Sequence, residues 1–158
     1  MLFRSIADPT IGGREFGPAL SDEVDAALRD AFEAIGRDDL VVVALGSYAR
    51  RELCPGSDVD VLLLHRRAEV AAVADALWYP LWDAGFVLGH AARTVREATK
   101  LAESDLETLT SLLDVRVVVG PATADAATLV HRVRRVARRR RAALIEELAA
   151  AAALRRER

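Results

Sequence analysis

Two short, mainly apolar runs, separated by a loop that contains glycine and proline, constrain the fold of this chain more than any other feature. The first run is LVVVAL at residues 40–45, and the second is DVDVLLLH at residues 58–65. Short runs that are rich in branched apolar residues are typical of strands buried on both faces. Because such strands need helices on both sides, the sequence predicts an α/β (α+β) domain with a small mixed sheet flanked by helices.

Periodic segments and capping signals predict the remaining elements. Ser21 is a good helix N-cap, and Gly36 is a good residue at a helix end. Pro80 is expected to kink or shorten the helix that contains it. A third strand is predicted from Phe86 to about Thr94. The predicted helices are 21–35, 68–84, 95–103 after a Thr94 cap, a helix capped by Ser104 or Asp105 that runs to about 119, and one or two helices over 124–156.

The chain divides into three predicted parts: an irregular lead-in over 1–20, a folded domain over 21–123 and an arginine-rich helical tail over 124–158. Its 158 residues, 52% of them hydrophobic, suffice for one globular core and exclude disorder throughout. The single cysteine, Cys54, excludes an internal disulfide, and neither a signal peptide nor a membrane span is evident. We therefore expect a soluble, cytoplasmic protein with no membrane partner.

The arginine-rich tail invites a nucleic-acid interpretation. From Arg132 onward the sequence holds ten arginines and three glutamates, although the net charge of the chain is −2. The run carries no aromatic residues to stack on bases, and Glu146 and Glu147 can pair with arginines one turn earlier. We expect a solvated helix face or a docking surface for another domain, and no nucleic-acid partner.

The segment between the two apolar runs carries the chemistry. Gly46 and Ser47 follow the first run, ten residues intervene, and Asp58 and Asp60 open the second run. Residues i and i+2 of a strand point to the same face, so the two carboxylates repel each other and need a positive partner. Oxygen-only ligands at the mouth of a strand favour Mg²⁺ or Mn²⁺.

The glycine and serine before these carboxylates suit a phosphate. Gly46 lets the backbone approach a phosphate closely, Ser47 adds a hydroxyl, and a helical turn after it would direct N–H groups at the anion. A phosphate cradle that faces a metal-binding carboxylate pair is the geometry for nucleotidyl transfer from an NTP. Arg51 is predicted to contact the nucleotide or to neutralise the aspartates, with a solvated loop charge as the alternative for it and for Arg50.

The pattern G-S-x(10)-D-x-D resembles the nucleotidyltransferase superfamily related to DNA polymerase β. Three blocks, ALGSYARRELCPGSDVDVLLLH, ADALWYPLWDAGFVLGHAARTVREA and ESDLETLTSLLDVRVVVG, look like the N-terminal domain of the bacterial [protein-PII] uridylyltransferase/uridylyl-removing enzyme family. The resemblance implies a nucleotidyltransferase fold, a Mg²⁺-dependent site formed by Gly46, Ser47, Asp58 and Asp60, and a role in nitrogen regulation. It also implies UTP as the donor, with ATP possible, and a tyrosine of the PII protein as the acceptor.

The sequence does not assign the general base that would activate an acceptor hydroxyl. The third predicted strand, FVLGHAART, has no acid, so His90 and Asp83 are the candidates for activating an acceptor hydroxyl. Arg93 either reaches the nucleotide or forms a salt bridge with Glu97 or with an aspartate. Two alternatives stay open: a non-catalytic remnant that binds a nucleotide or a partner, and a stand-alone transferase of the antitoxin type. We expect Mg²⁺-dependent NTP binding, with transfer weak or lost.

Overall fold

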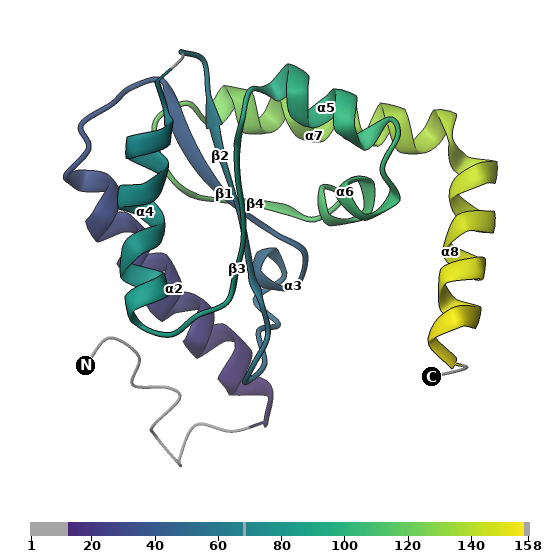
Figure 1. Ribbon diagram of the computed structural model, residues 1–158, viewed down its shortest axis with the longest axis horizontal. Coiled ribbons are helices and arrows are strands. Elements are labelled where there is room, and N and C mark those ends of the chain that lie inside the picture. The colour runs from purple at the N-terminus through teal and green to yellow at the C-terminus, as the bar shows by residue number, and fades with distance from the viewer. Residues whose placement is uncertain (1–12, 68, 157–158) are drawn as a thin grey trace.

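A computed structural model describes residues 13–67 and 69–156, and within them a sheet of four strands forms the centre of the fold (Figure 1). The strands lie in the order β3-β2-β1-β4, with β1 antiparallel to both of its neighbours and β2 parallel to β3. The strands are β1 (Leu40–Leu45), β2 (Val59–His65), β3 (Leu88–Arg93) and β4 (Val115–Val119). The predicted small mixed sheet is confirmed.

Helices cover both faces of this sheet. The described residues form a short 3-10 helix η1 (Gly13–Glu15) and the helices α2 (Phe16–Glu33), α3 (Gly46–Ala49), α4 (Ala71–Asp83), α5 (Val95–Ala102), α6 (Leu106–Ser111), α7 (Thr123–Arg139) and α8 (Arg141–Arg156). Figure 1 shows α2 and α4 together on one side of the sheet, and α5 and α7 together on the other. The sheet therefore has two separate cores.

The two central strands alternate their side chains between these cores. Val42 of β1 and Leu63 of β2 pack toward α2 and α4, whereas Val43 and Leu62 pack toward α5 and α7. All four of these side chains are buried, which confirms that both runs are strands with two apolar faces. Asp60 belongs to the second set by strand alternation, so it points to the α5–α7 face.

Several predicted caps and ends are confirmed. The hydroxyl of Thr94 accepts a hydrogen bond from the Glu97 N–H and Glu97 reciprocates, which makes a complete capping box at α5. Asp105 caps α6 by accepting from the Thr108 N–H at 2.7 Å. Gly36 adopts φ +64° just after α2 ends, a conformation that favours glycine.

The start of the first helix was predicted incorrectly. Helix α2 begins at Phe16, and Ser21 lies inside it, where its buried hydroxyl donates to the Gly17 carbonyl at 2.7 Å. Pro18 is tolerated because the first turn of a helix has no use for its missing N–H. The prediction of an irregular lead-in is therefore wrong from Gly13 onward, and residues 1–12 lie outside the described residues. Pro80 also does not end its helix, since α4 continues to Asp83.

The largest correction concerns residues 115–119, which were predicted to be helical and form the edge strand β4. Helix α6 already ends at Ser111. The segment VRVVV is rich in β-branched residues and pairs with β1, with Val117 opposite Val43. Pairing with a strand about 70 residues earlier in the chain outweighed the helical spacing of the preceding leucines.

Only part of the predicted arginine-rich tail, residues 124–158, extends away from the folded domain. Helix α7 packs against α5 and the sheet, and its Leu129, Val133 and Val136 are buried there. Helix α8 turns away from the body of the molecule (Figure 1). Across the described residues, no helix combines the length and apolar character that crossing a bilayer requires.

Candidate functional site

The end of strand β1 turns sharply into the short helix α3. Gly46 makes this turn with φ +53°, a left-handed conformation that glycine adopts without strain, and its N–H donates to the Asp114 carbonyl at 3.3 Å. The helical turn expected after Gly46 is thus present. Ser47 is half-buried, and its hydroxyl makes no hydrogen bond with the described residues. This hydroxyl is consequently available to a ligand.

Asp60 lies between two glycines at the mouth of the sheet. It pairs in register with Gly89 of β3, and a methyl group on Gly89 would lie only 2.0 Å from the Asp60 Oδ1 atom. A methyl group on Gly46 would lie 3.6 Å from Oδ2 of the same carboxylate. The Asp60 side chain therefore occupies space that the missing side chain of Gly89 leaves open, and it reaches toward the turn at Gly46.

Asp58 and Asp60 have no partner among the residues that the structure describes. Asp58 is exposed and Asp60 half-buried, and neither carboxylate makes a hydrogen bond or an ion pair within the described part of the chain. Burial raises the pKa of Asp60, and the negative charges of Asp58 and Glu107 raise it further. The sequence prediction that Asp58 and Asp60 act together is consistent with this repulsion, which a cation would relieve.

A divalent cation fits this donor set. Mg²⁺ is usually held by one or two carboxylates together with waters and substrate phosphates. No group of three or more His, Cys, Asp or Glu side chains within residues 13–67 and 69–156 is arranged to hold a metal by itself. Asp58 and Asp60 would therefore hold Mg²⁺ or Mn²⁺ only with oxygen atoms from a bound phosphate and water.

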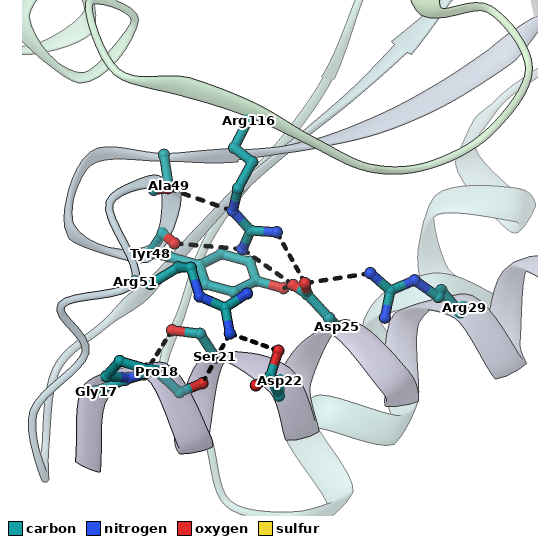
Figure 2. Close-up of polar contacts among 10 residues, drawn as sticks. All are labelled: Gly17, Pro18, Ser21, Asp22, Asp25, Arg29, Tyr48, Ala49, Arg51 and Arg116. Atoms are coloured by element: carbon teal, nitrogen blue, oxygen red, sulfur yellow. Dashed lines mark hydrogen bonds and ion pairs between the residues drawn. The ribbon is translucent and has the colours of Figure 1, made fainter. Parts of the chain in front are cut away.

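A buried polar network formed by Asp25, Tyr48 and Arg116 anchors helix α3, as Figure 2 shows. Asp25 of α2 is 1% exposed and accepts two hydrogen bonds from the Arg116 guanidinium, at 2.7 and 3.0 Å, and one from the Tyr48 hydroxyl at 2.5 Å. Arg116 also donates to the carbonyls of Tyr48 and Ala49, at 3.4 and 3.2 Å. The network joins α2, α3 and β4, and it fixes the turn that carries Ser47.

Sequence reasoning missed this network. Arg116 lies within an otherwise apolar run, VRVVV, and a charge in such a place needs a partner. That was the only local signal. Tyr48 is fully buried, burial and the Asp25 carboxylate raise the pKa of its hydroxyl, and the Arg116 guanidinium lies 5.1 Å from its ring centre.

The arginines that follow the turn are directed elsewhere. Arg51 donates to the Pro18 carbonyl at 3.3 Å and forms an ion pair with Asp22 at 2.5 Å, both on α2. Arg50 forms ion pairs with Glu52 and Asp114. The structure thus does not bring Arg51 to the aspartates, and its predicted contact with a nucleotide would require it to leave Asp22.

Neither predicted general base faces Asp60. Because Gly89 shares the face of Asp60, its neighbour His90 points to the opposite face, where its ring lies 5.9 Å from Trp78 and 5.2 Å from Trp82. Asp83 ends α4, which covers that same opposite face. Assigning the base to either residue is wrong for this geometry.

A cavity of about 350 Å³ opens beside Asp60 on the α5–α7 face. Strands β2 and β3 form one side and helices α5 and α6 the other. Glu107 of α6 lines it and acts electrostatically on Asp60, a role that no spacing in the sequence indicated. This volume lies in the range of small-molecule sites, about 300–1,000 Å³. The arrangement can accommodate a small molecule whose anionic end lies at the two aspartates.

Comparison with known proteins identifies related chains. The family model described as a nucleotidyltransferase domain matches residues 26–143. The chain is 43% identical over 119 residues to the bifunctional uridylyltransferase/uridylyl-removing enzyme of Streptomyces coelicolor, which covers 70% of this chain and 14% of that protein. It is 45% identical over 114 residues to the enzyme of the same name from Mycobacterium tuberculosis strain H37Rv, covering 68% and 14%. The chain thus spans about one seventh of the length of these relatives.

One solved structure shows a similar fold at low sequence identity. A crystal structure described as a toxin–antitoxin with AMP-PNP superimposes with a TM-score of 0.51 at 15% identity, covering 78% of this chain and 98% of that one. At that identity the likeness concerns the fold alone.

Proposed function

We propose, because the chain belongs to the nucleotidyltransferase domain family, that it transfers a nucleoside monophosphate from an NTP to a hydroxyl group and releases pyrophosphate. The similarity to uridylyltransferases further supports UTP as the donor, with ATP as the alternative, and a protein hydroxyl as the acceptor. A tyrosine of a PII-type protein is the acceptor that this similarity favours, which would place the chain in nitrogen regulation.

One observation carries the proposal. Asp60 lies beside the Gly46 turn and Asp58 just before β2, and neither has a neutralising partner among the described residues. A half-buried carboxylate that a second carboxylate repels destabilises a fold unless a ligand compensates it. Perturbed, unpartnered acids beside a cavity are typical of functional sites.

Each residue of the site has a stated role in this proposal. Asp58 and Asp60 would hold Mg²⁺ or Mn²⁺, which when bound neutralises charge on the triphosphate. Gly46 leaves room for a phosphate, and the free Ser47 hydroxyl donates a hydrogen bond to it. The Asp25–Tyr48–Arg116 network keeps α3 in place, so that positioning needs little reorganisation on binding.

A second candidate function is a nucleotide-binding module without transfer activity. The observation that favours it is the position beside Asp60 on β3, which is Gly89 and so adds no third carboxylate. With His90 and Asp83 on the opposite face, the carboxylates across the cavity among the described residues are Glu107 and Asp105, and Asp105 is already engaged as the cap of α6. Both candidates require NTP binding, and they differ in transfer alone.

A labelling assay tests the proposal. The chain is incubated with Mg²⁺, a PII protein and each α-labelled NTP in turn, and label on the acceptor and released pyrophosphate are measured. We expect label from UTP in excess of ATP, none without Mg²⁺, and none with the Asp58→Asn/Asp60→Asn variant. Binding of UTP without label on any acceptor would favour the second candidate, and label that persists in the double variant would contradict both.

A further inference from the structure

The cavity beside Asp60 has two chemically different ends. Asp60 and Glu107 line one end, and Arg93 lines the cavity from the far end of β3. Arg93 lies four positions after Gly89, which corresponds to about 13 Å along a strand. A ligand that spans the cavity therefore meets carboxylates at one end and a guanidinium at the other.

Arg93 is available to a ligand. It is half-buried and makes no hydrogen bond or ion pair within the described part of the chain. Glu97, the partner considered from the sequence, is engaged in the capping box with Thr94 at 2.7 and 2.8 Å and interacts with Arg93 through its charge alone. A half-buried guanidinium presents five donors and no acceptor, so it needs acceptor atoms from elsewhere.

The walls between the two ends suit a partly apolar group. Leu62 and Ala91 of the strands and Leu112 after α6 supply apolar surface. Thr108 and Ser111 of α6 add hydroxyls, and the Thr108 hydroxyl makes no hydrogen bond with the described residues. Apolar walls with a few convergent polar groups are characteristic of small-molecule sites.

From this arrangement we infer that the cavity holds the ribose and base of the nucleotide, and that Arg93 reads a carbonyl edge of the base. The inference rests on the proposed function, which locates the phosphates at Asp58, Asp60 and Ser47. The base then lies farther along β3, away from the metal-binding end. Thr108 and Ser111 face the nucleoside from α6.

The chemistry of Arg93 favours one class of base. Uracil offers carbonyl oxygens as acceptors, like the O4 of thymine, whereas adenine and cytosine present an amino donor on the corresponding edge. A guanidinium cannot accept from an amino group. Sites built to form such hydrogen bonds discriminate strongly against a base that leaves them unpaired. The cavity accordingly selects UTP over ATP and CTP.

Calorimetry in Mg²⁺ with UTP, ATP and inorganic tripolyphosphate tests the inference. Arg93→Met should weaken UTP binding by at least about tenfold, as loss of a charged hydrogen bond implies, and reduce the preference for UTP over ATP. Tripolyphosphate, which lacks a nucleoside, should bind this variant within about twofold of the wild type. Arg96→Met removes the same charge from an exposed position on α5 outside the cavity, and should bind every probe like the wild type.

A second variant tests the cavity without changing charge. Ser111→Leu fills the space beside α6 and should abolish UTP binding while tripolyphosphate binding persists. Undiminished UTP binding by both variants, or equal losses of UTP and tripolyphosphate in Arg93→Met, would overturn the inference and leave the proposed function standing. A wild-type chain that binds neither UTP nor tripolyphosphate in Mg²⁺ would overturn the proposed function itself.

Discussion

Asp25 and Asp60 are two carboxylates on either side of helix α3, and they differ in what surrounds them. Asp25 is 1% exposed and receives hydrogen bonds from Arg116, Tyr48 and Arg29. Asp60 is half-buried and has no partner among the described residues, and the charges that raise its pKa, those of Asp58 and Glu107, are negative. A buried charge with partners stabilises a local arrangement, whereas one without partners indicates that a ligand supplies the opposite charge.

Helix α3 connects these two environments. Its first residue, Gly46, lies against Asp60, and its Tyr48 lies against Asp25. The comparison therefore predicts that variants at Asp25 and its partners reduce the stability of the fold, and that variants around Asp60 reduce ligand binding. Measurements of stability and of ligand binding on matched variants distinguish these two effects.

The largest expected effect is on stability, in Arg116→Met. This change leaves the Asp25 carboxylate buried with only Tyr48 and Arg29, and removing one partner of a buried pair costs about 3–5 kcal/mol. Urea denaturation measures the free energy of unfolding. Arg29→Met is the matched control, because it removes the same group from the same carboxylate at an exposed position, where such pairs contribute below about 1 kcal/mol. Equal losses in the two variants would contradict the structural role of Arg116.

The second effect is on binding, in Asp58→Asn/Asp60→Asn. Removing both charges should weaken Mg²⁺-dependent NTP binding by more than about 100-fold, or about 2.7 kcal/mol, because the metal loses its protein ligands. The free energy of unfolding should not fall, since the change relieves repulsion. Asp75→Asn/Asp83→Asn, on the exposed surface of α4, removes the same total charge and should bind NTP normally. Comparable losses in both double variants would indicate a general charge effect.

A smaller effect is expected for Gly89→Ala. The added methyl group meets the Asp60 carboxylate at 2.0 Å, so the carboxylate must leave its position between Gly89 and Gly46. We expect about a tenfold loss of Mg²⁺–NTP affinity with little change in thermal stability, because a flexible side chain can move. In an Asp60→Asn background the same glycine change should add almost no further loss, which a double-mutant cycle measures. Additive losses would show that Gly89 acts independently of Asp60.

The smallest effect is a pH dependence at a third carboxylate, Asp39. Hydrogen bonds from the Arg37 guanidinium, at 2.8 and 2.9 Å, lower the pKa of Asp39 from 3.8 to about 2. A carboxyl group with a lowered pKa stabilises the fold above pH 3.8, and that contribution disappears as the pH falls toward 2. Thermal melts should show Asp39→Asn less stable than the wild type at neutral pH, with the difference closing over this interval.

Asp60 should show the opposite pH dependence of stability. Its pKa is raised by burial and by Asp58 and Glu107, so its ionisation destabilises the fold as the pH rises. Without ligand, Asp60→Asn should therefore be at least as stable as the wild type at neutral pH. Its advantage should shrink on acidification. A stability loss in Asp60→Asn at neutral pH would contradict the distinction between partnered and unpartnered carboxylates.

The site was predictable where its residues are close in sequence. Gly46, Ser47, Asp58 and Asp60 lie within fifteen residues, and strand alternation alone predicts that the two carboxylates share a face. The two candidates for the general base, His90 and Asp83, do not face Asp60. The register of β3 with β2 decides the face on which His90 lies, and the packing of α4 on the sheet decides the position of Asp83. Gly89 rather than His90 is paired with Asp60, so His90 packs against the tryptophans of α4.

What the sequence determined by itself was the pair of central strands, the turn at Gly46 and the carboxylates after it, because apolar runs and glycine conformations are local properties. Tertiary structure decided the rest. Residues 115–119 form a strand because they pair with the edge of β1 that β2 leaves free. Arg116 donates hydrogen bonds to Asp25, which lies 91 residues earlier in the chain. Such contacts depend on which distant segments the fold brings together, and no local spacing contains that information.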